Sequence, residues 1–127
     1  MPFLTAEQLE RFEEEGYLIL RGMLDIDAVI QPIIDEYHGV LDNLARELYA
    51  AGQIESTYDE LAFGQRLTRI VVDSGQIHAQ YFDFSLPQTG ITPDTPFWTG
   101  PAVFKCLTHP NLLDVVESVV GPEIWSN

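Results

Sequence analysis

Apolar residues recur with a helical period along much of this chain. From Ile30 to Leu48 they are spaced alternately four and three residues apart, at Ile30, Ile34, Tyr37, Leu41, Leu44 and Leu48. This spacing predicts a long amphipathic helix with one apolar stripe. Asp25 is a candidate N-cap before the helix, and Pro32 is expected to kink its first turns or to delay its start. Gly52 is the expected end of this helix.

Capping patterns predict two further helices in the first half of the chain. Residues 5–8, TAEQ, form a capping box, and Gly16 is a plausible stop for the helix that follows. Residues 57–60, TYDE, form a second capping box. The helix that this second box opens is expected to turn four apolar residues inward: Leu61, Leu67, Ile70 and Val71.

Two more helices are expected near the end of the chain. Pro101 follows Gly100 and suits the first position of a short helix. Residues 108–110, THP, then begin a helix rich in leucine and valine, which Gly121 and Pro122 end.

Other segments predict extended chain. Tyr17–Leu20 is a short apolar run bounded by glycines, as in a buried strand, and residues 123–127, EIWSN, are typical of the entry to a strand. In residues 77–100, Phe82, Phe84 and Leu86 alternate before a loop rich in glycine and proline. We therefore expect an α+β fold for residues 1–127, as a single partial domain that is mostly helical and has one or two strands of an incomplete sheet.

The net charge of the chain limits the classes of partner that it can be expected to bind. With 6 basic and 20 acidic residues the net charge is -14, and residues 1–60 alone hold 14 acids and 3 bases. Such a surface argues against nucleic acid and anionic membranes, which require basic residues. This net charge is consistent with a solvated acidic surface or with binding to a cationic partner. The only cysteine, Cys106, excludes an internal disulfide and is compatible with a cytoplasmic location. No secretory signal or membrane-spanning run is evident.

The histidines are the first candidates for a metal site. Asp35, His38 and Asp42 share one face of the predicted helix, although the solvated flank of the apolar stripe explains them more simply. His78 lies in an aromatic segment and is interpreted as a partly buried imidazole, and His109 as a polar residue at a helix start. The residues two positions after the three histidines are valine, glutamine and asparagine, so the chain contains no His-x-Asp pair.

Two other pairs of residues are candidates for a chemical role. Cys106 and His109 are three residues apart, a spacing that suits a nucleophile and its base, but the apolar neighbours of Cys106 favour core packing. Arg66 and Arg69 are candidates for binding a carboxylate or phosphate, and pairing with the surplus acids is the simpler interpretation. The sequence thus assigns no catalytic, cofactor-binding or metal-binding residue, and the substrate-binding residues are unknown, with 77–100 as the best guess for a pocket wall.

Two segments together resemble a known family. "LTAEQLERFEEEGYLILRGMLDIDAV" resembles the opening of phytanoyl-CoA dioxygenase-like proteins, and "GPAVFKCLTHPNLLDVVESVVGPEIWSN" resembles the helix that precedes their catalytic sheet. "GQRLTRI" and "FDFSLP" are similar to segments of bacterial members. The resemblance covers nearly the whole chain and rests on the order and spacing of motifs that are weak singly.

The resemblance implies the N-terminal part of a double-stranded β-helix (jelly-roll) oxygenase that uses Fe(II) and 2-oxoglutarate. The family's His-x-Asp pair, later His and 2-oxoglutarate-binding Arg match no position here, so the chain alone is expected to bind neither cofactor and to be inactive. Its partners would be the remainder of the oxygenase fold and, in the complete protein, a small-molecule substrate. The alternatives are a freestanding acidic helical module that binds a protein through its Ile30–Leu48 stripe, and an inactive paralogue.

Overall fold

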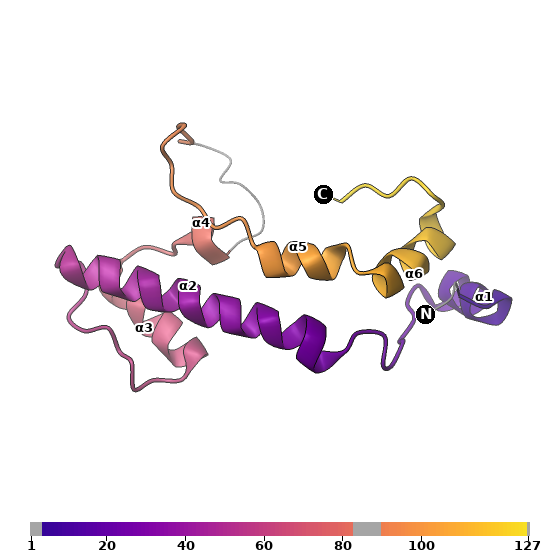
Figure 1. Ribbon diagram of the computed structural model, residues 1–127, viewed down its shortest axis with the longest axis horizontal. Helices are drawn as coiled ribbons and strands as arrows, with labels where there is room; N and C mark the ends of the chain where they lie inside the picture. Colours follow the sequence, from indigo (N-terminus) through magenta and orange to yellow (C-terminus); the bar gives the residue numbers. More distant parts are fainter. Residues whose placement is uncertain (1–3, 83–89, 127) are drawn as a thin grey trace. The chain divides into compact units, whose positions relative to one another are not determined.

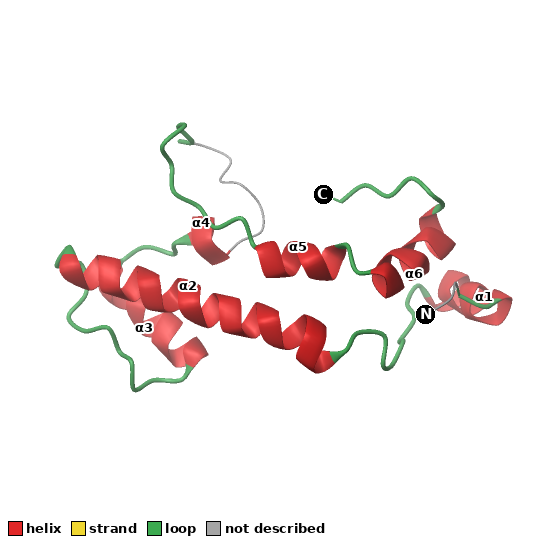
Figure 2. Ribbon diagram, viewed as in Figure 1, coloured by secondary structure: helices red, strands yellow, loops and turns green. Residues whose placement is uncertain are grey.

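The computed structural model describes residues 4–82 and 90–126, which form helices joined by loops (Figure 2). The elements, labelled in Figure 1, are α1 (Ala6–Glu15), η1 (Ile26–Ile30), α2 (Gln31–Ala50), α3 (Phe63–Ser74), α4 (Ala79–Phe82), α5 (Pro101–Leu107) and α6 (Pro110–Val120). Contacts divide the chain into two compact units. We call Met1–Pro32 with Pro101–Asn127 the terminal unit, and Ile33–Gly100 the central unit.

The predicted α+β fold is wrong for the described residues, because no strand occurs among them. Tyr17–Leu20 and residues 123–126 are extended or irregular chain outside any sheet. The Tyr17–Leu20 pattern does alternate, with Tyr17 and Ile19 exposed and Leu18 and Leu20 half-buried. Alternation alone does not make a strand, since its N–H and C=O groups need a second strand to pair with. The described residues therefore contain no part of a jelly-roll sheet.

The central unit contains the hydrophobic core. The α2 stripe supplies Leu41, Leu44, Ala45 and Leu48, and these pack with Ile54, Tyr58 and Ile70. Leu41 is 1% exposed, while Ala45 and Ile70 are fully buried. The predicted helix of residues 30–48 is confirmed, as is its end, where Gly52 has a left-handed φ of 70°.

The start of α2 shows the expected effect of Pro32. The Asp25 carboxylate caps the first turn by accepting a hydrogen bond of 2.6 Å from the Ala28 N–H. This capped turn, η1, is a wide π-helical turn in which the Gln31 N–H donates to the Ile26 carbonyl. A proline ring clashes with the carbonyl four residues before it, and widening the turn relieves that clash.

Most of the local capping predictions are confirmed. In α1 the Gln8 N–H donates to the Thr5 hydroxyl and the Thr5 N–H donates to the Gln8 side chain, at 3.2 and 2.9 Å. α1 ends at Gly16. α5 begins at Pro101, and α6 begins after His109, whose side chain caps it, and ends at Gly121.

The capping box predicted at residues 57–60 is wrong. Tyr58 has a left-handed φ of 53°, and the Leu61 N–H donates back to the Tyr58 carbonyl in a turn. α3 starts only at Phe63, after Ala62, without a side-chain cap. A helix cannot start at residue 58 because its first residues must have right-handed φ and ψ.

Residues 77–100 also differ in part from the prediction. Residues 79–82 form the short helix α4 rather than extended chain. Phe84 and Leu86 lie outside the described residues. The loop that follows is held to α2 by the Trp98 indole N–H, which donates to the Glu36 carboxylate at 2.9 Å. Among the described helices, none has the length and apolarity needed to cross a bilayer.

Candidate functional site

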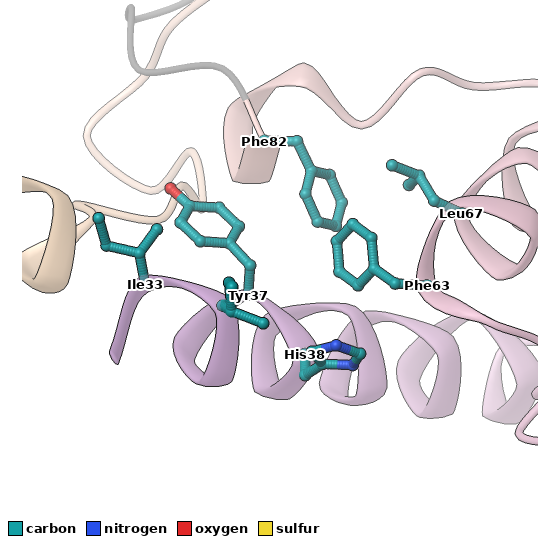
Figure 3. A pocket seen from close by; sticks show the side chains of 7 residues that line it. Ile33, Tyr37, His38, Phe63, Leu67 and Phe82 are labelled. Atoms are coloured by element: carbon teal, nitrogen blue, oxygen red, sulfur yellow. The ribbon is translucent and has the colours of Figure 1, made fainter. Parts of the chain in front are cut away.

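An open apolar cavity of about 460 Å³ lies in the central unit, where α2, α3 and α4 meet. α2 supplies most of its lining, α3 supplies two side chains and α4 supplies one; the lining residues are Ile33, Ile34, Tyr37, His38, Phe63, Leu67 and Phe82 (Figure 3). We call this space the aromatic cavity. Its volume is within the range of about 300–1,000 Å³ that is usual for small-molecule sites.

Four rings shape the aromatic cavity. The Phe63 and Phe82 side chains point toward one another and are in contact, with ring centroids 6.4 Å apart and an interplanar angle of 75° (Figure 3). Tyr37 lies 6.2 Å from Phe82, and the His38 ring lies 5.1 Å from Phe63 at an angle of 68°. Edge-to-face contacts of this kind are the favoured arrangement of aromatic rings.

Helix periodicity explains how the walls form. Ile33 and Tyr37 are four residues apart on α2, as are Ile34 and His38, so each pair lies on one side of the helix. Phe63 and Leu67 are likewise four apart on α3, and both pack against the hydrophobic core. Burial, reinforced by the neighbouring Glu36 carboxylate, raises the pKa of the Tyr37 hydroxyl above its usual value. The cavity is therefore a region of low polarity built on the side of the core.

A buried arginine on α3 is ion-paired with a carboxylate on α2. The Arg66 guanidinium donates to the Thr57 carbonyl at 2.9 Å and to the carboxylates of Asp42 and Asp59 at 3.1 and 2.6 Å. Arg66 is 9% exposed. The simpler sequence interpretation, that Arg66 pairs with surplus acids, is confirmed.

Arg69 also pairs with an acid. It lies 3.4 Å from Asp73 and stacks over the Tyr58 ring, with 5.4 Å from its guanidinium carbon to the ring centroid. The Tyr58 hydroxyl donates to the Asp73 carboxylate, and this hydrogen bond raises the pKa of the Tyr58 hydroxyl. The polar groups of Tyr58, Arg69 and Asp73 thus contact one another beside the core.

The α2 residues considered for metal binding have other roles. Asp42 pairs with Arg66 and, at 2.8 Å, with Arg46. His38 lies against Phe63 in the aromatic cavity. Asp35 is exposed on the same helix. Within residues 4–82 and 90–126, no three His, Cys, Asp or Glu side chains converge as a metal-binding group.

His78 is buried, as its aromatic segment suggested. It is 5% exposed, and its Nε2 lies 2.8 Å from the Ser74 hydroxyl. Burial lowers the pKa of the His78 imidazole. The residue has a left-handed φ of 58°, which places its ring back toward the end of α3. The sequence contains no signal for the Ser74 contact, which depends on this turn.

Cys106 and His109 line a smaller cavity of about 270 Å³ in the terminal unit, together with Lys105 and residues of η1 and α5. The His109 Nδ1 accepts a hydrogen bond of 3.2 Å from the Asn111 N–H. His109 therefore caps α6, as its position at a helix start indicated. Cys106 is half-buried, which agrees with packing.

Sequence reasoning found only part of the aromatic cavity. The sequence predicts Ile34 and Tyr37 on the apolar stripe and an inward-facing Leu67, but it contains no signal that groups His38, Phe63 and Phe82 with them. Among the described residues of the 77–100 segment, where the sequence predicts a pocket wall, Phe82 is the one that lines the cavity. No periodic signal joins Phe63 and Phe82, because they lie on separate helices.

Comparison of the chain with protein-family models, curated proteins and solved structures found no match. The resemblance to phytanoyl-CoA dioxygenase-like proteins thus stays a prediction. The described residues do not fit the iron centre that it implies, because a 2-His-1-carboxylate site needs three converging ligands. Here Asp42 is held by arginines, His78 by Ser74 and His109 by the start of α6.

Proposed function

We propose that this chain is a helical scaffold of an Fe(II)- and 2-oxoglutarate-dependent oxygenase of the phytanoyl-CoA dioxygenase type. Other polypeptide would supply the iron and 2-oxoglutarate ligands, and the chain alone would be inactive. The proposal rests on the order of the motifs in the sequence and on one structural observation, the uncovered apolar surface of the terminal unit.

Few side chains of the terminal unit are fully buried, and several large apolar ones are exposed. Val29 is its only buried side chain among the described residues, and α1, α5 and α6 bury none. Phe104 is 65% exposed, Val120 is 60% exposed and Trp125 is 87% exposed. α6 carries its leucines and valines along one face, opposite Asp114 and Glu117, as in an amphipathic helix whose apolar face is covered.

Covering this surface would be strongly favourable. Burial of one large apolar side chain contributes about 1.5–3 kcal/mol, so burial of three such side chains contributes several kcal/mol in total. We propose that the catalytic part of the oxygenase covers these apolar residues, because the α5–α6 segment resembles the helix that precedes that part. Its substrate would be a small molecule, its location the cytoplasm, and neither nucleic acid nor membrane a partner.

A freestanding interaction module is the second candidate, and the same exposed surface favours it. The Ile30–Leu48 stripe cannot serve as its binding face, since Leu41, Leu44 and Leu48 are buried in the core. The exposed apolar residues of the terminal unit, among them Phe104, Val120 and Trp125, would take that role instead.

The gene sequence after the codon for Asn127 tests the proposal most directly. An in-frame continuation that encodes His-x-Asp and later a His and an Arg is the expected result, and any other continuation overturns the proposal. When the chain is expressed together with that continuation, the amides of α5 and α6 should exchange hydrogen more slowly than they do in the 127-residue chain. The amides of α2 and α3 serve as the internal control.

Two measurements on the 127-residue chain complete the test. Incubated with Fe(II) and 2-oxoglutarate, it should form no succinate, and succinate formation would refute the scaffold assignment. A sharp thermal transition that does not depend on protein concentration would favour the freestanding module.

A further inference from the structure

The aromatic cavity has a composition that selects its ligand. Among the described residues, its lining side chains apart from Tyr37 and His38 are hydrocarbon, and none of them is Lys, Arg, Asp or Glu. A charged ligand would lose its hydration there without a counter-charge, which is costly. Anions are further disfavoured by the chain's net charge of -14.

The rings add a preference for flat ligands. Phe63 and Phe82 are in edge-to-face contact, tilted by 75° to one another, so a ligand ring that packs beside this pair can make stacked or edge-to-face contacts with them. The His38 side chain is exposed and lies beside Phe63, where its imidazole can donate a hydrogen bond to a ligand hydroxyl or accept one from it. The space of about 460 Å³ accommodates one or two fused rings.

We propose that the aromatic cavity is a binding site for a small, neutral aromatic molecule that carries a hydroxyl group. Its rings pack against the Phe63 and Phe82 side chains, and the hydroxyl contacts His38. The site belongs entirely to the central unit and does not depend on the scaffold function proposed above. Binding can therefore be tested on the 127-residue chain, whatever polypeptide covers the terminal unit.

The test uses 2-naphthol as the probe and amide chemical shifts as the readout. Titration should shift the amides of the lining residues in α2, α3 and α4 and leave those of α5 and α6 in place. Shifts centred on the exposed apolar residues of α5 and α6 would show non-specific adsorption and overturn the proposal, as would the absence of any shift at saturating probe.

Two matched variants on α2 locate the site. Ile34 lines the cavity and is 44% exposed, while Tyr49 lies outside it and is 54% exposed. Ile34→Asn should raise the dissociation constant for 2-naphthol about tenfold, whereas Tyr49→Asn should change it less than about twofold. Because both positions are half exposed, both variants should stay folded, as circular dichroism will check. Equal effects of the two substitutions would overturn the assignment.

Two further probes test the ligand class. Naphthalene-2-sulfonate and 2-naphthyl-trimethylammonium keep the rings but carry a charge, and each should bind at least about tenfold more weakly than 2-naphthol. Cyclohexanol keeps the hydroxyl without the ring and should bind more weakly still. Tighter binding of a charged probe, or equal binding of cyclohexanol, would refute the neutral aromatic class. His38→Ala should weaken the binding of 2-naphthol but not of naphthalene, and equal weakening of both would refute the contact between His38 and the hydroxyl.

Discussion

Replacing Arg66 with alanine should destabilise the central unit far more than replacing Arg46. Both arginines pair with Asp42, at 3.1 and 2.8 Å, so the two substitutions remove one partner from the same carboxylate. The Arg66 side chain is 10% exposed, whereas that of Arg46 is 70% exposed. The comparison therefore separates the effect of burial from the effect of pairing.

The expected magnitude follows from the three contacts of Arg66. Its charge-assisted hydrogen bond to the Thr57 carbonyl contributes about 1.5–3 kcal/mol. The Asp42 and Asp59 side chains are 33% and 69% exposed, so each pair adds about 1 kcal/mol or less. Arg66→Ala should thus lower the free energy of unfolding by about 3 kcal/mol. Arg46→Ala should lower it by about 0.5 kcal/mol or less, as for a surface pair.

Trp98 provides the assay because it lies in the central unit and is hydrogen-bonded to Glu36 on α2. Trp125 is 87% exposed in the terminal unit, so Trp125→Phe removes its emission at little structural cost. Urea unfolding in this background, followed by Trp98 fluorescence, gives the free energies of the variants. If the losses for Arg66→Ala and Arg46→Ala agree within about 0.5 kcal/mol, burial of the guanidinium does not stabilise this unit and the reasoning fails.

Three further outcomes are expected from the same structure. Ile70→Ala, at a fully buried position, should cost about 2–5 kcal/mol in the urea assay, against almost nothing for Val72→Ala, at a residue that is 67% exposed; similar losses would contradict the assigned core. Because burial lowers the pKa of His78, the unfolded chain binds its proton more readily, so stability should be complete above about pH 6.5 and should fall as the pH drops below that value. His78→Asn, which tolerates left-handed φ, should flatten this dependence and His38→Asn should not; an unchanged slope in His78→Asn would exclude His78 as its source. In hydrogen exchange on the 127-residue chain, α5 and α6 amides should exchange faster than those of α2, since the former bury no side chain; equal protection would show that the terminal unit has a core of its own.

The sequence by itself determined most helix ends, because the groups that end a helix are near neighbours in the chain. Thr5 and Gln8 close the first capping box, Asp25 caps the turn before α2, and Gly121 follows α6. Pro32 also acted locally, by widening the turn before it. The failed box at residues 57–60 marks the limit of this reasoning, since the left-handed Tyr58 is held by Asp73 and stacked under Arg69, both on α3.

The tertiary structure alone decided what the helices bury and which side chains meet. The α2 and α6 patterns are both apolar, yet α2 has five buried residues and α6 has none among those described. Likewise, an alternating run such as Tyr17–Leu20 becomes a strand only where another strand faces it, and the described chain has none. Phe63 and Phe82 meet because α3 and α4 pack on the same stretch of α2. The physical reason is that a cap depends on residues within one turn, whereas burial, strand pairing and cavity walls depend on contacts between segments far apart in the sequence.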